Sequence, residues 1–245
     1  MKVAFGRRGK ATIPLNNAMA AKLVVLLFLV AFGASAQSVS RKQPLPKFMG
    51  REVTITDPGT DEDGFFPKGP ATVCVEGPPQ RQCYTMPEDF GKSPEATLVQ
   101  VEKGLPALLF SAESGGVSGF TIHFALLHPG TGKELEDLLP DISISNQSEH
   151  EFWNLPALSD APVFAIGDCV LGPDESHYSE HRYIISTYTR LPSSMVDGLY
   201  YYLEDQYMTT RKYAEGSHIL SSEKPEILAR LRRVKAEYQR QQRKP

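Results

Sequence analysis

Two histidines and a glutamate in the second half of the sequence come closest to a catalytic constellation. They are His177, Glu180 and His181, in the order H-x-x-E-H. On a helix, residues four apart share a face, so both imidazoles could bind one zinc ion while the carboxylate acts on the metal-bound water. The neighbouring sequence favours a loop, since Gly172-Pro173 precedes the motif and a β-branched and aromatic run, residues 183–189, follows it. We therefore expect a polar loop. The alternatives are a non-catalytic metal or ligand site that also uses Asp174 and Glu175, and a metal-dependent hydrolase.

A dense run of carboxylates, residues 57–64, resembles part of a calcium-binding loop. Asp61 and Asp63 fit the later ligand positions of that pattern. Gly59, however, stands where the first ligand belongs, and Pro70 stands where the closing bidentate glutamate belongs. An EF-hand is therefore excluded. We expect a solvated acidic turn and no cofactor, with zinc at the histidines or weak calcium binding here as the alternatives.

Tyrosines crowd the last part of the strand-forming sequence. We single out Tyr200, Tyr202 and Tyr207, with Arg211 beside them, as candidate ligand-binding residues. Tyrosine side chains with one apolar end and one wet end are favoured at surfaces that recognise other molecules. Strand alternation also turns one of Tyr201 and Tyr202 inward, so core packing accounts for part of the cluster.

The strands and loops that carry these candidate residues are expected to follow an N-terminal export signal. An apolar run, residues 23–32, is too short to span a bilayer but fits the hydrophobic part of a signal peptide. Only basic charges precede it, and Ala34-Ser35-Ala36 before Gln37 matches the cleavage pattern of such peptides. We expect cleavage after Ala36 and a mature chain that is periplasmic or extracellular.

The mature chain of 209 residues is acidic, with one basic end. It carries 21 Lys and Arg against 29 Asp and Glu, a formal charge of −8. Residues 37–221 contribute −13 to this charge, whereas residues 222–245 contribute +5. An acidic body argues against nucleic acid as a partner, because phosphate binding requires a basic surface. The length suffices for one domain with a sizeable core.

Cys74 and Cys83 form the expected disulfide. Disulfides persist in the oxidising compartments that exported chains reach. The eight residues between the two cysteines have turn formers at their centre and strand-like residues on either side. A hairpin would therefore place the two sulfurs opposite each other. Cys169 remains unpaired in an apolar run, so we expect a buried free thiol rather than a nucleophile.

From residue 72 the sequence changes to short apolar runs with period-two alternation and turn signals, which is typical of antiparallel strands. The expected class is mainly β: an antiparallel sandwich or barrel-like meander of short hairpins in residues 71–213. An extended Pro/Gly-rich arm, residues 37–70, precedes it. The candidate strands are residues 72–76, 82–85, 97–102, 107–112, 120–127, 141–145, 163–171, 182–190, 199–203 and 207–213.

Only residues 222–243 are plainly helical. Ile227 and Leu231 belong to one apolar stripe, Ser222 can cap the start, and Pro225 is tolerated in the first turn. The opposite side is basic. Such an amphipathic helix either docks on the β domain or makes peripheral contact with an anionic membrane.

Incomplete catalytic motifs, together with abundant hairpin loops and tyrosines, favour binding over catalysis. The leading hypothesis is an exported, non-enzymatic β domain that binds a protein or a cell-envelope ligand. An inhibitor of a secreted hydrolase is one form of it, by analogy. The alternatives are the metal-dependent hydrolase and a structural protein tethered to the envelope through its basic helix.

Overall fold

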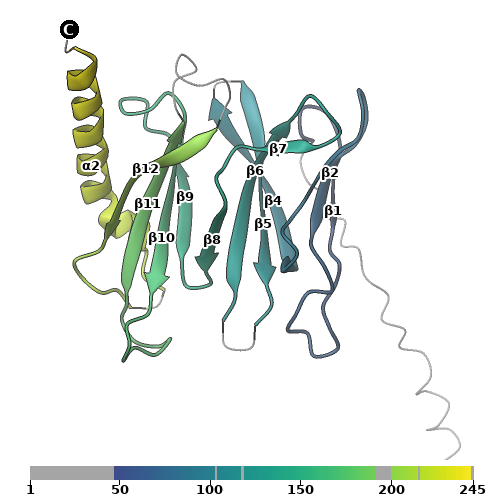
Figure 1. Ribbon diagram of the computed structural model, residues 1–245, viewed down its shortest axis with the longest axis horizontal. Coiled ribbons are helices and arrows are strands. Elements are labelled where there is room, and N and C mark those ends of the chain that lie inside the picture. The colour runs from purple at the N-terminus through teal and green to yellow at the C-terminus, as the bar shows by residue number, and fades with distance from the viewer. Residues whose placement is uncertain (1–46, 103, 117–118, 191–199, 215, 244–245) are drawn as a thin grey trace, which may run out of the picture. The chain divides into compact units, whose positions relative to one another are not determined.

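The computed structural model describes residues 47–102, 104–116, 119–190, 200–214 and 216–243. The expected signal peptide, residues 1–36, and the first part of the arm lie outside them. Twelve strands and one helix make up the described chain, which confirms the expected mainly β class with a C-terminal helix (Figure 1). The elements are β1 (Val53–Thr56), β2 (Thr72–Val75), β3 (Gln82–Thr85), β4 (Phe90–Glu102), β5 (Leu105–Ser114), β6 (Thr121–Pro129), β7 (Leu135–Asp137), β8 (Ile142–Ser145), β9 (Glu149–Trp153), β10 (Val163–Val170), β11 (Arg182–Arg190), β12 (Tyr201–Met208) and α2 (Ile219–Gln242).

The described strands form three antiparallel sheets, none of which closes into a barrel. The first sheet holds β1, β2 and β3 in sequence order. The second follows the order β4-β5-β6-β7, with β8 paired to another part of β6, and the third follows the order β12-β11-β10-β9. Most strands therefore pair with their neighbours in sequence, as expected for successive hairpins.

Three hydrophobic clusters fill the spaces between successive layers. One joins the first sheet to the second, another joins the second sheet to the third, and the last joins the third sheet to α2. Figure 1 shows the same succession, from β1 and β2 on one side to α2 on the other. The second and third sheets are thus covered on both faces.

Strands with two covered faces explain the unbroken apolar runs in the sequence. In β5, Leu108 and Phe110 pack toward the first sheet, whereas Leu109 packs toward the third. In β10, Phe164 packs toward the second sheet and Ala165 toward α2. Successive side chains of a strand point to opposite faces, so burial on both faces requires apolar residues at consecutive positions.

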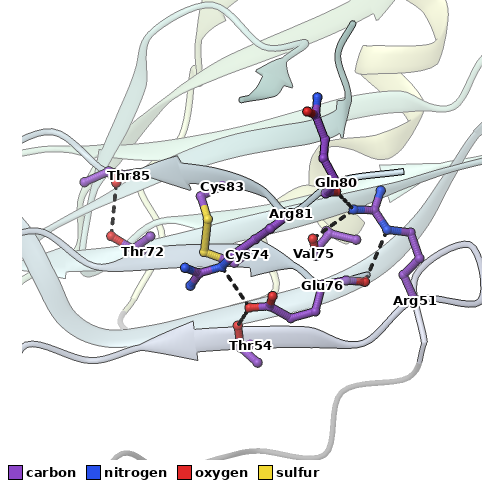
Figure 2. Close-up of a disulfide and its surroundings, with 10 residues drawn as sticks. All are labelled: Arg51, Thr54, Thr72, Cys74, Val75, Glu76, Gln80, Arg81, Cys83 and Thr85. Carbon is purple, nitrogen blue, oxygen red and sulfur yellow. Dashed lines mark hydrogen bonds and ion pairs between the residues drawn. A yellow bond between two sulfur atoms is a disulfide. The ribbon is translucent and has the colours of Figure 1, made fainter. Parts of the chain in front are cut away.

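The expected disulfide joins β2 to β3 (Figure 2). Cys74 and Cys83 face each other in the strand register, and their Cα atoms are 4.1 Å apart. The predicted pairing is therefore confirmed. Beside β2 lies β1, which comes from the segment predicted as an arm.

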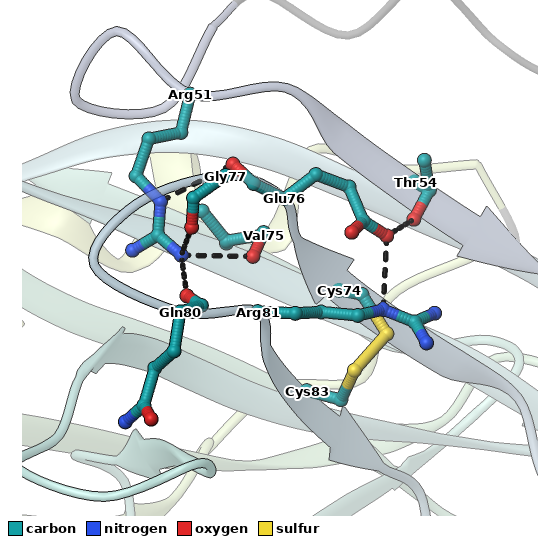
Figure 3. A network of polar contacts seen from close by, with 9 residues as sticks. All are labelled: Arg51, Thr54, Cys74, Val75, Glu76, Gly77, Gln80, Arg81 and Cys83. Carbon is teal, nitrogen blue, oxygen red and sulfur yellow. Dashed lines mark hydrogen bonds and ion pairs between the residues drawn. A yellow bond between two sulfur atoms is a disulfide. The ribbon is translucent and has the colours of Figure 1, made fainter.

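The guanidinium group of Arg51 also stabilises this hairpin, through hydrogen bonds to its main chain (Figure 3). Its Nε donates to the carbonyl oxygen of Glu76 at 3.3 Å, and its Nη2 donates to that of Val75 at 2.9 Å. The same Nη2 also donates to the carbonyl oxygens of Gly77 and Gln80. One side chain thus satisfies several main-chain acceptors of a loop, which fixes that loop against the first sheet.

The helix begins before its predicted start, and Ser222 is not its cap. The first turn of α2 is completed from another element, since Glu149 in β9 accepts a hydrogen bond from the N–H of Leu220 at 2.8 Å. A carboxylate is favoured there because it faces the positive end of the helix dipole. Pro225 consequently lies in the second turn rather than the first.

The apolar stripe of α2 docks on the third sheet. Ile227 and Leu231 are buried in the cluster that joins the two, while Arg232 and Arg233 are exposed. Contact of this basic side with an anionic membrane stays a prediction. The described residues contain no helix with the length and apolar character needed to cross a membrane.

The strand predictions differ from the structure in several places, among them the start of β4, which lies at Phe90 rather than at residue 97. The two segments predicted as residues 199–203 and 207–213 contribute to one strand, β12. Neither β7 nor β9 was expected. β7 has three residues, and β9 carries Glu149, His150 and Glu151 in succession, so neither shows the alternation that marks a half-buried strand.

A half-buried carboxyl group in β7 makes stability depend on pH. Burial raises the pKa of Asp137 to about 6, although its carboxylate accepts hydrogen bonds from the N–H groups of Leu126 and Leu139. The group holds its proton more tightly in the folded state, so the free energy of unfolding falls as the pH rises from about 4 to about 6.

We expect Asp137→Asn to relieve this penalty, because asparagine keeps an acceptor oxygen and carries no charge. The variant should be more stable than wild type by up to about 3 kcal/mol near about pH 7, and the advantage should vanish near about pH 4. Urea unfolding of both proteins at the two pH values measures the difference. Equal stability at neutral pH would show that the folded protein accommodates the charge without cost.

Candidate binding site

A bulge in β12 decides which side chains face α2. The pairing of β12 with β11 is regular on both sides of Glu204, which itself has no partner. Tyr202 and Tyr207 are five residues apart, so regular alternation would place them on opposite faces. The extra residue shifts the alternation, and both tyrosines lie on the face that α2 covers.

One hollow, the Tyr207 groove, lies between the end of β12 and the first half of α2. Its volume is about 650 Å³. Two of the predicted binding residues, Tyr207 and Arg211, come together in it. The lining includes Tyr207, Met208 and Arg211 on the sheet side, and Glu223, Pro225 and Arg230 on the helix side.

Glu223 organises the polar contacts of this groove. Its buried carboxylate accepts hydrogen bonds from the hydroxyl of Tyr207, at 2.9 Å, and from the hydroxyl of Tyr213. Arg211 donates to the Tyr213 hydroxyl at 2.6 Å and lies 3.8 Å from the Glu223 carboxylate. Arg230 lies over the ring of Tyr207, 4.5 Å from its centroid. Hydrogen bonds and stacking therefore hold both aromatic rings in place.

The electrostatics of the groove keep its tyrosine hydroxyls protonated. Burial and the Glu223 carboxylate raise the pKa values of Tyr207 and Tyr213, so both hydroxyls stay protonated at neutral pH. Arg230 is neutralised by Asp205, with contacts of 2.5 and 3.0 Å. A general acid or base works best with a pKa near the operating pH, which these tyrosines lack.

A separate hollow, the Tyr202 cavity, lies beside the start of β12 and the second half of α2. Its volume, about 580 Å³, falls in the range of small-molecule pockets. The third predicted residue, Tyr202, therefore lies in a different hollow from Tyr207. The lining includes Tyr202 and Glu204 from β12, Leu231 and Tyr238 from α2, and Leu158 and Asp160 from the segment between β9 and β10.

The fourth predicted residue, Tyr200, lines neither hollow. Its exposed hydroxyl donates to the carboxylate of Glu136 in β7. The predicted binding set is thus divided among three places, of which only the groove holds two members.

The predicted zinc residues are not brought together as a metal site. His181 is buried, and its Nδ1 lies 3.0 Å from a carboxylate oxygen of Glu175, whose other oxygen pairs with Lys212 at 2.7 Å. These two contacts, together with a hydrogen bond from the N–H of Gly172, lower the pKa of Glu175 to about 2. His177 and Glu180 are exposed in the loop between β10 and β11. Within the described ranges, no three His, Cys, Asp or Glu side chains are grouped closely enough to hold a metal ion.

Two of the carboxylates in residues 57–64, those of Asp57 and Asp61, accept hydrogen bonds from their own main chain. One oxygen of Asp61 accepts hydrogen bonds from the N–H groups of Phe65, at 2.8 Å, and Phe66, at 3.2 Å. Asp57 accepts one from the N–H of Gly59 at 2.8 Å. These carboxylates therefore shape the turn.

Cys169 is a half-buried free thiol. Its sulfur lies 3.5 Å from the side-chain oxygen of Gln147, and burial raises its pKa. Since the thiolate is the reactive form, this environment does not activate the residue as a nucleophile.

Sequence reasoning missed Glu223 and Arg230, the helix residues that complete the groove. The helical periodicity of the sequence could have identified both residues. Glu223 lies four residues before Ile227, and Arg230 lies three residues after it, so both accompany the docked stripe. A charged residue at such a position needs a partner on the covered sheet, and Tyr207 and Asp205 provide it.

No protein-family model, curated protein or solved structure matches this chain.

Proposed function

We propose that the mature chain is an exported β domain that binds a protein or cell-envelope ligand through the Tyr207 groove. The observation that carries the proposal is the convergence of Tyr207 and Arg211 with two residues of α2, Glu223 and Arg230. Tyrosine and arginine dominate binding hot spots, because they combine a large contact area with directional polar groups.

The order within the groove supports a binding role. Glu223 and Arg230 already hold the ring of Tyr207, so this side chain would lose little further conformational freedom when a ligand binds. Met208 and Arg211 remain exposed for contact. The acidic body attracts a basic partner, and inhibition of a secreted hydrolase with a basic surface is one form that such binding would take.

Capture of partners by the immobilised mature chain, residues 37–245, tests the proposal. An envelope extract of the source organism is passed over wild type and over Arg211→Ala, and captured molecules are quantified. We expect at least one molecule to be captured by wild type and about tenfold less of it by the variant, as for a hot-spot arginine.

Arg81→Ala is the matched control. The side chains of Arg81 and Arg211 are both 61% exposed, and each forms an ion pair with a glutamate. Arg81 lies on the hairpin of the first sheet, so its variant should capture as wild type does. Equal capture by the two variants, or no molecule specific to wild type, would refute the groove as the binding site.

A further inference from the structure

The positive charges of the Tyr202 cavity already face acceptors of the protein. Arg190 pairs with Glu102 at 2.6 Å. Lys235 donates through Nζ to the carbonyl oxygens of Ala157 and Leu158 at 3.1 and 3.2 Å. An incoming anion would have to compete with these contacts, so the cavity is poorly suited to one.

Two carboxylates of the cavity have no cationic partner. Glu204 accepts a hydrogen bond from the hydroxyl of Thr189 at 2.8 Å, and Asp160 is exposed at the rim. Throughout the described part of the chain, no ion pair joins either of them to a basic side chain. A half-buried carboxylate that meets only neutral donors favours the approach of a cation.

The rest of the cavity wall is apolar or aromatic. Leu158, Val163 and Leu231 contribute aliphatic surface, and Tyr202 and Tyr238 contribute aromatic rings. A long side chain with a charged end packs its methylene groups on such a wall while its head reaches a polar group. Tyrosine rings also attract cations through their negative faces.

We propose that the Tyr202 cavity receives a lysine side chain of a protein partner. The methylene stem packs on Leu158 and Leu231, and the ammonium group reaches Glu204 and Asp160. This inference rests on the proposed function, since the lysine belongs to the protein that the domain binds. The net charge of −8 on the mature chain favours the approach of a basic partner.

Lysine fits better than arginine because of the geometry at Glu204. The Glu204 carboxylate accepts a hydrogen bond from the Thr189 hydroxyl at one oxygen, and the Tyr202 hydroxyl also interacts with it. A guanidinium group gains most from a fork that uses both oxygens, whereas an ammonium group acts as a compact point charge.

Titration with a lysine derivative tests the inference without the unknown partner. Nα-acetyl-lysine methylamide is added to the mature chain, and amide chemical shifts are followed by NMR. The matched probe, Nα-acetyl-norleucine methylamide, has a similar linear stem and no amine. We expect saturable binding of the lysine probe, with shifts in residues 202–204 and 231–238, and affinity at least about tenfold lower for the norleucine probe.

Three variants locate the binding. Glu204→Gln and Asp160→Asn should each weaken the lysine probe by about tenfold, whereas Glu180→Gln, in the exposed β10–β11 loop, should leave it unchanged. Asp160 is exposed, so its variant should fold and provides the test if Glu204→Gln does not fold.

Three outcomes would overturn the inference: equal affinity for the two probes, no effect of either cavity variant, or no binding at about 10 mM probe. Ethanolamine that binds as tightly as the lysine probe would assign the site to a lipid head group instead. Arg211→Ala should not alter probe binding. If Arg211→Ala loses partner capture but still binds the probe, the result tests the proposed groove alone. If a cavity variant loses probe binding but still captures the partner, the result tests the lysine site alone.

Discussion

Phe164→Ala is expected to lower the free energy of unfolding by about 3–5 kcal/mol, the typical cost of removing a fully buried phenylalanine. Phe164 in β10 has no exposed surface and lies at the centre of the cluster between the second and third sheets. Its ring stacks on Phe152 at 4.6 Å and meets Phe124 edge-on at 6.0 Å. Alanine would leave a cavity that neighbours in two sheets cannot fill without moving both.

Urea or guanidinium unfolding of the mature chain measures this loss, and Phe66→Ala is the control. Phe66 is 51% exposed, so its truncation should cost less than about 1 kcal/mol. A similar small loss for Phe164→Ala would mean that the second and third sheets do not share one packed cluster.

Removal of the disulfide is the other large effect. The double variant Cys74→Ser/Cys83→Ser should be less stable than wild type by about 2–3 kcal/mol, because a short closed loop no longer restricts the unfolded chain. The hairpin itself should persist, since Arg51 holds its loop from the other side. The loss is therefore expected in the unfolding equilibrium rather than in the arrangement of the first sheet.

Unfolding with and without dithiothreitol checks the assignment of this effect. Reductant should lower the stability of wild type and of Cys169→Ser equally, because Cys169 is a free thiol. It should have no effect on the double variant. A reductant effect that disappears in Cys169→Ser would contradict the pairing of Cys74 with Cys83.

Local patterns in the sequence were enough to predict most of the fold. Alternation predicted β2, β3 and β11 closely, and the cysteine spacing predicted the pairing between β2 and β3. β7 and β9 escaped this reasoning, because β7 has only three residues and the charged start of β9 lacks the alternating pattern. The start of α2 was predicted too late because its capping carboxylate, Glu149, lies 71 residues away in sequence.

The candidate site was predicted only in part, for a reason that lies in β12. The tyrosines could be selected from the sequence because of their residue type. Which of them lie together depends on the bulge at Glu204, because every residue of β12 after the bulge points to the opposite face of the sheet from the one that regular alternation would give. The residue types around Glu204 do not predict a bulge. The helix side of the groove also needed the tertiary position of α2, which brings Glu223 to Tyr207.

The order of pairing along the chain has a consequence for biosynthesis. Most strands pair with neighbours in sequence, so each sheet can assemble from a segment that is already synthesised when the next one emerges. The last described element, α2, forms one wall of both hollows. A nascent chain can thus complete its three sheets before either hollow exists, and both hollows form only when the helix packs on the third sheet.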